Sequence, residues 1–298
     1  MLHQPIMDKL FALKLGGMLE GLREQMEGSQ YKKLSFDERF GLLLDREWDL
    51  RQSRKLHRRM RMARFREKAV IEDLDISAKR GLDRKQVLYL AEGKWINEKL
   101  NMVITGPTGA GKTYLACALG NAACRNGYSV RYFQLSRLLE KLKLARADGS
   151  YPKLLDQIAK YKLLILDDWL RNHLTETQTN DILETVEDRY NHSSTLVVTQ
   201  IPVTEWHEQF ASPTLADAIM DRIVHNAYRL ELKGESMRKR KSSLTHSGHL
   251  EVLMKSQRRF APKGGRNESE SVTGLVGISN YPQNEQNLPQ WISPNWRV

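Results

Sequence analysis

Cysteine is scarce in this sequence: Cys117 and Cys124 are the only two among 298 residues. They lie seven positions apart in a stretch that is predicted to be helical, and the sequence contains no Cys-x-x-Cys pair. A disulfide framework or a zinc site would need more cysteines or a different spacing. The sequence therefore predicts two buried thiols.

Long apolar runs are missing as well. No stretch approaches the roughly 20 apolar residues that a membrane-spanning helix needs. Residues 1–5 are not a basic segment followed by an apolar core, which is the pattern of a secretory signal. We therefore expect a cytoplasmic protein with no membrane partner.

Acidic residues are rare in two segments of a chain whose net charge is +11. Residues 51–68 hold nine Lys or Arg against Glu67, and residues 238–266 hold nine against Glu251. Together these segments carry +16, which leaves the rest of the chain at −5. One such run would equally suit a solvated helix face, but two predict a polyanionic partner, DNA or RNA.

The first part of the chain, residues 1–70, is predicted to be a helical domain that binds DNA or a partner protein. Ser35 and Glu38 form the capping-box pattern in front of a helix expected over 36–66. Apolar residues share one side of its later part, and arginines cover much of the rest. One side can therefore pack while the other faces a partner.

From residue 101 onward, short apolar strands alternate with helices. The predicted strands are 101–105, 129–133, 162–167, 194–199 and 228–232. The predicted helices between them are 112–126, 136–147, 153–160, 175–191 and 214–226. This alternation predicts an α/β fold, a parallel five-stranded sheet covered by helices on both faces. We assign it to a domain of residues 71–245, followed by a basic and then polar tail, 246–298, that is predicted to be disordered.

Residues 106–113 read Gly-Pro-Thr-Gly-Ala-Gly-Lys-Thr and lie between a predicted strand and a predicted helix. The glycines let the backbone turn its N–H groups inward, and the start of the helix adds to the attraction for an anion. Lys112 is expected to reach the β- and γ-phosphates of ATP, and the Thr113 hydroxyl to ligate Mg²⁺. A chance glycine-rich turn would lack this strand and helix. The predicted nucleotide contacts are Gly106, Pro107, Thr108, Gly109, Ala110, Gly111, Lys112, Thr113 and Tyr114.

Polar residues end two later strands of this predicted sheet, 162–167 and 194–199. Asp167 is expected to hold Mg²⁺ beside the phosphate-binding loop, and Asp168 to act as the general base for the attacking water. Thr199 and Gln200 end a later strand, where a polar side chain would lie between the water and the γ-phosphate. Polar residues are common at strand ends, so the sequence leaves this last role open.

These residues together resemble those of the AAA+ ATPases, and more closely of the IstB-type transposition helper proteins of bacterial insertion sequences, which are kin to DnaC-type helicase loaders. The resemblance runs from residue 9 to about residue 241. Its distinctive stretches are 80–83, 106–113, 163–168, 218–222 and 232–238. The last of these is the most specific to IstB-like sequences, whereas the phosphate-binding loop alone is common to many ATPases.

The resemblance implies the Walker A role for Lys112 and Thr113 and the Walker B role for Asp167. Asp168 stands where AAA+ proteins usually have Glu, and this acid is one methylene shorter, which predicts slow hydrolysis. Thr199 with Gln200 falls at the sensor-1 position, where Ser-Asn is the commoner pair.

The resemblance also implies roles for two arginines. Arg222 matches the arginine finger, which acts on ATP bound by a neighbouring subunit, although a surface ion pair would equally explain it. Arg238 matches sensor 2, which contacts ATP of its own subunit, although it also belongs to a basic cluster that can face DNA. A finger supplied by a neighbour requires a homo-oligomer, which we expect to be a ring or a helical filament on DNA.

The leading prediction is therefore an ATPase that assembles on duplex DNA in an ATP-dependent way and assists a transposase in target selection. Its basic segments would contact mainly phosphates, so its affinity for DNA should fall with salt. The first alternative is a replicative helicase loader. The second is a small-molecule kinase, for which the sequence offers no acceptor-binding cluster.

Overall fold

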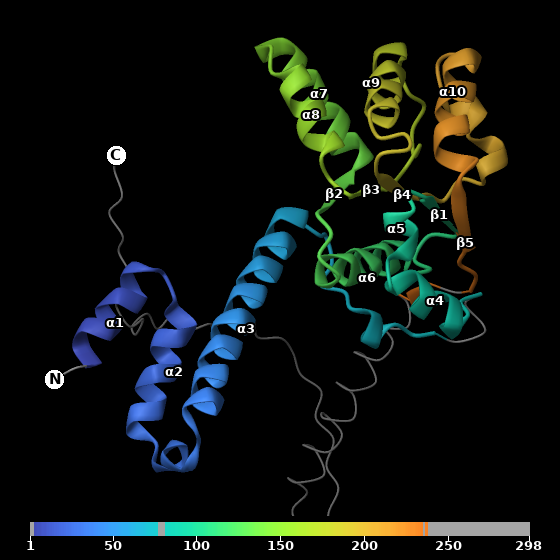
Figure 1. Cartoon of the computed structure of the whole chain (residues 1–298). Helices are drawn as coiled ribbons and strands as arrows, with labels where there is room; N and C mark the ends of the chain where they lie inside the picture. Colours follow the sequence, from blue (N-terminus) through green and yellow to red (C-terminus); the bar gives the residue numbers. More distant parts are fainter. Residues whose placement is uncertain (1–2, 77–80, 235, 238–298) are drawn as a thin grey trace, which may run out of the picture. The chain divides into compact units, whose positions relative to one another are not determined.

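The computed structural model describes residues 3–76, 81–234 and 236–237 (Figure 1). Arg238, the whole second basic segment (238–266) and the predicted tail 246–298 lie outside these residues. Within the part that is described, no helix is long and apolar enough to cross a membrane.

The chain begins with helices, as predicted. They are α1 (His3–Ala12), α2 (Gly16–Glu27), the short 3₁₀ helix η1 (Ser29–Lys33) and α3 (Phe36–Ala63). The capping box in front of α3 is confirmed, because the Glu38 N–H donates to the Ser35 hydroxyl and the Ser35 N–H donates to the Glu38 carboxylate. The helix ends at Arg64, whose φ of 54° is left-handed and turns the chain away.

A buried carboxylate joins α2 to α3. Leu15 precedes α2 and has no side-chain oxygen that can cap the helix. The Glu47 carboxylate of α3 takes this role and accepts hydrogen bonds from the N–H groups of Gly17 (2.7 Å) and Met18 (3.3 Å). A Cβ at Gly17 would lie 2.7 Å from the Glu47 Cα, so only glycine allows this approach.

A second group of short helices leads into the sheet: η2 (Ile71–Asp73), α4 (Arg84–Ala91) and α5 (Lys94–Asn97). The strands are β1 (Asn101–Thr105), β2 (Val130–Gln134), β3 (Leu163–Asp167), β4 (Ser194–Val198) and β5 (Ala227–Glu231). The helices between them are α6 (Lys112–Arg125), α7 (Leu135–Asp148), α8 (Tyr151–Ala159), α9 (Glu176–Glu187) and α10 (Pro213–Val224), with η4 (Val203–Glu205) and η5 (His207–Gln209) after β4. Each predicted strand and helix of this region is confirmed, with ends that shift by a few residues.

The five strands form one parallel sheet in the order β2-β3-β4-β1-β5. The predicted parallel five-stranded sheet is therefore confirmed. The registers pair Gln134 of β2 with Asp167 of β3, and Ile104 of β1 with Val198 of β4. Because all strands run the same way, the residues that end them share one edge of the sheet.

Helices cover both faces of the sheet. Figure 1 shows α7–α10 on one face and α4–α6 on the other. The first face is packed by a cluster that includes Trp169, Trp206 and Phe210. On the second face, Ala63 and Ala69 are buried with α6, so the end of α3 belongs to this core. The predicted domain boundary near residue 70 stays a prediction.

Both cysteines lie on α6 in the second core, as free thiols. Burial raises the pKa of Cys117 to about 11 and that of Cys124 to about 12. The predicted pair of buried thiols is confirmed, and both thiols are packing groups.

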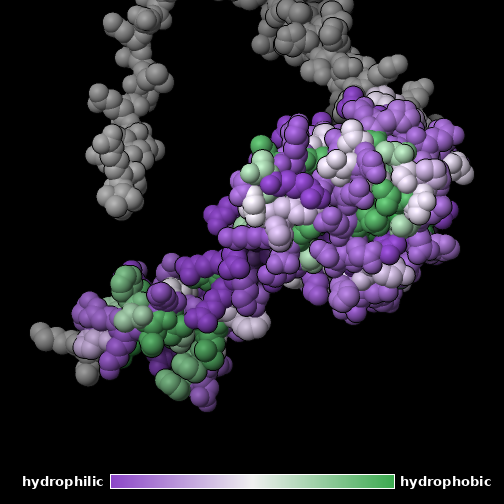
Figure 2. All heavy atoms as spheres, turned by 90° about the horizontal axis from the view of Figure 1, so that it is seen from above, coloured by the Kyte–Doolittle hydropathy of each residue, from purple (hydrophilic) through white to green (hydrophobic). Residues whose placement is uncertain are grey.

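The N-terminal helices carry much of the exposed apolar surface (Figure 2). The most exposed large apolar side chains there are Phe11, Leu13, Phe36 and Trp48. Leu43 is the only large apolar side chain of α1–α3 that is buried among the residues described. These helices therefore have little core of their own.

Candidate nucleotide-binding site

A phosphate-binding loop follows β1 and leads into α6. Gly106, Gly109 and Gly111 have φ values of 142°, 83° and 87°, a region that favours glycine. A Cβ at Gly106 would collide with the Leu232 carbonyl oxygen, and one at Gly109 with the Ser236 hydroxyl. The glycines are needed for the conformation of the loop and for the close approach of the segment that follows β5.

Lys112 is the first residue of α6 and is buried at the base of the loop. Its Nζ donates to the carbonyl oxygens of Gly106 (2.7 Å) and Pro107 (2.9 Å). Burial lowers the pKa of Lys112, while the nearby carboxylates of Asp167 and Asp168 oppose that change. The ammonium group is thus held inside the concave side of the loop, where an anion would bind.

Asp167 ends β3 beside the start of α6. Its Oδ2 accepts hydrogen bonds from the Thr113 hydroxyl (2.9 Å) and from the Tyr132 hydroxyl (2.6 Å). Burial, together with the hydrogen bond to Asp167, raises the pKa of Tyr132, which keeps this hydroxyl a donor. The structure thus brings together the two residues that the sequence predicts as Mg²⁺ ligands.

Asp168 has a φ of 55°, in the left-handed region that aspartate tolerates better than most residues. Its N–H donates to Asp167 Oδ1 at 2.9 Å. Its own carboxylate Oδ2 accepts from Gln134 Nε2 at 2.6 Å and lies 3.5 Å from Arg66 Nη1. The predicted general base is therefore at the site, and one of its oxygens has two positively polarised neighbours.

Thr199 and Gln200 point to different places. The buried Thr199 hydroxyl donates to the Trp169 carbonyl oxygen (2.9 Å) and accepts from the Ile201 N–H (3.1 Å). Gln200 Oε1 instead accepts at 2.5 Å from the hydroxyl of Thr108, a residue of the phosphate-binding loop. A catalytic role of Thr199 stays a prediction, and its only O–H is already donated to the loop after β3.

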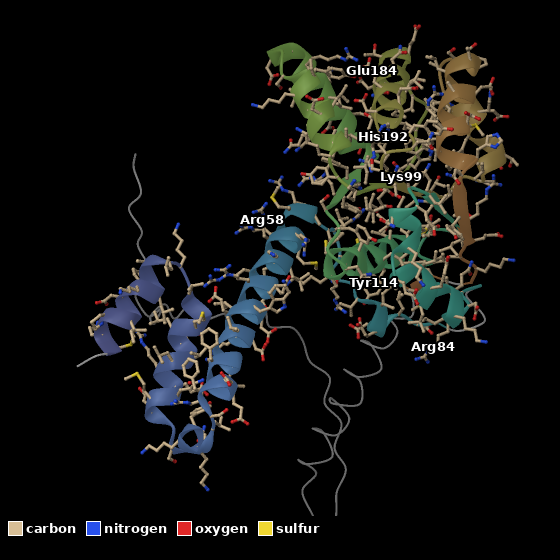
Figure 3. The ribbon with its side chains drawn as sticks, viewed as in Figure 1. Arg58, Arg84, Lys99, Tyr114, Glu184 and His192 are labelled. Atoms are coloured by element: carbon tan, nitrogen blue, oxygen red, sulfur yellow. The ribbon has the colours of Figure 1, made fainter. Side chains whose placement is uncertain are left out.

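A cavity of about 550 Å³ joins these groups, within the size range of small-molecule sites. Tyr114, labelled on α6 in Figure 3, is one of the predicted residues that line it. Gly106 and Pro107 contribute the carbonyl groups that hold Lys112, and Ala110 is fully buried. The other predicted residues that line the cavity are Thr108, Gly109, Gly111, Lys112, Thr113, Asp167, Asp168 and Thr199.

Several residues of the site were missed by sequence reasoning. Tyr132 and Gln134 lie on β2, which pairs with β3, so the parallel-sheet rule could have placed them beside Asp167. Leu74 and Met237 line the cavity from segments before and after the sheet. Arg66 reaches it from the end of α3, for which the sequence carries no local signal.

Arg222 lies away from this cavity. Its carbonyl oxygen accepts from Asn101 Nδ2 (2.8 Å) at the first residue of β1, whereas the phosphate-binding loop follows the last. The length of β1 thus separates the two by roughly 13 Å. The Arg222 side chain forms an ion pair with Glu187 at 2.5 Å and donates to the Ala218 carbonyl oxygen. Arg238 lies outside the described residues.

The strand order, the phosphate-binding loop after β1 and the two acids at the end of β3, Asp167 and the following Asp168, define a P-loop ATP-binding protein with an AAA+ core. A sequence family described as IstB-like ATP binding protein matches residues 8–245. The chain belongs to this family.

Named relatives support the same membership. The insertion sequence ATP-binding protein y4pL of Sinorhizobium fredii is 47% identical over 239 residues, which are 80% of this chain and 98% of the relative. The ATP-binding protein of insertion sequence IS1162 of Pseudomonas fluorescens is 45% identical over 203 residues, 68% of this chain and 88% of the relative. Among solved structures, the crystal structure of DnaI matches with a TM-score of 0.47 and 22% identity, over 56% of this chain and 92% of that one.

Proposed function

We propose that this protein hydrolyses ATP with Mg²⁺, assembles on duplex DNA in an ATP-dependent way, and assists the transposase of an insertion sequence in target selection. The observation that carries the proposal is the convergence of Lys112, Thr113, Asp167 and Asp168 on one cavity. The family membership and the names of the relatives support the link to insertion sequences.

The residues present fit a magnesium nucleotide. Thr113 and Asp167 offer hard oxygen ligands 2.9 Å apart, and Mg²⁺ is commonly bound by one or two such groups together with phosphates. The ion would supply charge neutralisation at the phosphates. Lys112, released from its two carbonyl partners, would bind phosphate oxygens inside the loop.

Hydrolysis needs a base beside the attacking water. Asp168 lies next to Asp167 and lines the same cavity, so its carboxylate would accept the proton of that water. Its Oδ2 accepts from Gln134 and lies beside Arg66, so the orientation of this base depends on those two side chains. We place Gln200, rather than Thr199, as the polar side chain that orients the water, since it faces the phosphate-binding loop.

The second half of α3 is the basic surface proposed for DNA. Arg54, Lys55, Arg58 and Arg61 are exposed there, and Arg58 is labelled on this half of the helix in Figure 3. Guanidinium and ammonium groups along one helix suit a row of phosphates and carry no base preference of their own. This supports binding to duplex DNA with little sequence selectivity.

Arg222 is proposed to act on the ATP of a neighbouring copy. It lies at the edge of the sheet where the strands begin, opposite to the phosphate-binding loop of its own chain. It therefore cannot reach an ATP molecule bound by that loop. A head-to-tail contact would bring the Arg222 of one copy to the cavity of the next, which builds a ring or a filament. Its ion pair with Glu187 would then be exchanged for phosphate.

Replicative helicase loading is the second candidate function, because the family is related to DnaC-type loaders. A pull-down separates the two candidates. Retention of the element's transposase supports the first proposal, and retention of a replicative helicase instead supports the loader.

The proposal is tested by ATPase rates with and without duplex DNA. We expect DNA to stimulate wild type, with less stimulation as salt rises. Lys112→Ala should abolish the activity, and Asp168→Ala should abolish hydrolysis while ATP still binds. Lys153→Ala, which removes an exposed lysine of α8, is the control and should behave as wild type. An ATPase rate that does not change when duplex DNA is added, or activity that remains in Lys112→Ala, would refute the proposal.

A further inference from the structure

Arg66 connects the end of the basic helix α3 to both acids of the nucleotide site. Its Nη1 lies 3.5 Å from Asp168 Oδ2, and the guanidinium interacts with the Tyr132 hydroxyl, which donates to Asp167. Burial alone would lower the pKa of Arg66, but Tyr132 and the two carboxylates raise it. Arg66 is therefore a permanent cation aimed at the predicted general base.

The backbone around Arg66 is fixed to the core on both sides. Before it, the Met62 carbonyl oxygen of α3 accepts from Arg131 Nη1 of β2 at 2.8 Å. Phe65 packs where Gly120 of α6 has no side chain, because a Cβ there would lie 2.5 Å from the Phe65 ring. After it, Ala69 is buried in the same cluster. The backbone around Arg66 is therefore held at the core, and its half-exposed side chain is the part that can move relative to Asp168.

Both contacts hold the Asp168 carboxylate through one oxygen. Oδ2 accepts from Gln134 and faces Arg66, so these two side chains set the orientation of the carboxylate. Gln134 lies on β2 and is fixed by the sheet. Arg66 lies on the connection to α3 and is half exposed, so it is the partner that can leave.

We propose that Arg66 is a positioning residue that holds the Asp168 carboxylate in a resting orientation and releases it when DNA engages the basic face of α3. This inference rests on the proposed function, and it adds the route by which DNA bound at α3 changes the rate of hydrolysis. Phosphates bound along α3 by Arg58 and its neighbours would also attract the half-exposed Arg66 guanidinium, which then leaves Asp168.

The test compares basal and DNA-stimulated kcat and KM for Arg66→Ala. We expect basal kcat to rise about two- to fivefold, the range that a half-exposed ion pair supports, with KM for ATP unchanged. The ratio of stimulated to basal rate should fall toward one. Lys85→Ala is the control, because it removes an exposed cation that lies outside the basic segment 51–68, and it should keep the wild-type ratio.

Two further variants keep the test decisive if Arg66→Ala unfolds. Arg66→Gln keeps a donor for Tyr132 without the charge and should also raise basal kcat. Arg66→Lys keeps the charge and should restore part of the coupling. Stimulation of both Arg66→Ala and Arg66→Gln at the wild-type ratio, or a change in KM alone, would overturn the inference while leaving the proposed function intact. A wild type that DNA does not stimulate would contradict the proposed function, and the coupling with it.

Discussion

At the scale of single residues, the neighbouring side chains of Thr199 and Gln200 make contacts of different kinds. Thr199 is buried and uses its hydroxyl to join the loops after β3 and β4, through Trp169 and Ile201. Gln200, the next residue, is exposed and contacts Thr108 of the phosphate-binding loop. Both residues follow the end of β4, and their contacts differ, so Gln200 is the one of the two that faces the phosphate-binding loop.

These different contacts predict that one substitution lowers activity and the other lowers stability. Gln200→Ala should lower kcat at least about tenfold, the low side of what one positioned donor contributes. Its effect on stability should stay within about 0.5 kcal/mol. Thr199→Val should instead cost about 1–3 kcal/mol of stability, because it leaves a buried carbonyl and a buried N–H without the hydroxyl. Thermal unfolding and steady-state kinetics check both variants. A stable, inactive Thr199→Val protein would contradict this assignment.

The loop and the acids could be predicted from sequence because each is a local pattern. Gly106–Thr113 lies between a strand and a helix, and Asp167 and Asp168 directly follow a buried apolar strand. Arg66 and Tyr132 could not be found in this way. Arg66 reaches Asp168 only through the left-handed turn at Arg64 and the packing of Phe65, which are tertiary effects.

At the scale of elements, α3 joins the N-terminal helices α1 and α2 to the core of the sheet. It is 28 residues long; its first half packs on α2, and its last residues are buried against α6. Its length and capping box were predictable from sequence. The Glu47 cap on α2 was not, because Gly17 and Glu47 are 30 residues apart and their contact depends on how the two helices meet.

The Glu47 cap predicts a pH dependence of stability. Burial would raise the pKa of Glu47, but hydrogen bonds from Arg51, Gly17 and Met18 lower it below its usual value of 4.5. A depressed carboxyl pKa stabilises the fold fully above the unfolded value, about pH 4.5, and the contribution is lost as pH falls through the folded value.

Glu47→Gln should therefore lower the unfolding free energy at pH 7, by on the order of 1.5 kcal/mol for the loss of charge-assisted hydrogen bonds. The difference from wild type should shrink as the pH falls below about 4.5. Asp45→Asn, an exposed acid on the same helix, is the control and should change little. Denaturant unfolding at several pH values gives the comparison. A constant difference between pH 7 and pH 3 would exclude this role for Glu47.

At the scale of the whole molecule, the site is incomplete within one chain in this account. Lys112, Asp167 and Asp168 line the cavity, whereas Arg222 lies at the opposite edge of the sheet. A repeated head-to-tail contact would join the two edges. Every nucleotide site would then be composite, with the cavity from one copy and Arg222 from the next. ATP would then stabilise the contact between copies as well as serve as substrate, which suits a protein that assembles on DNA.

The composite site is tested most directly by mixing two inactive variants. Asp168→Ala keeps Lys112 and Thr113 for ATP and supplies an intact Arg222, whereas Arg222→Ala supplies an intact cavity. Each should be inactive alone in the presence of duplex DNA. Mixed in equal amounts, they should regain activity at roughly one interface in four, where an intact cavity meets an intact arginine. A mixture that stays as inactive as its components would contradict the account, as would an active Arg222→Ala protein that sediments as a monomer with ATP and DNA.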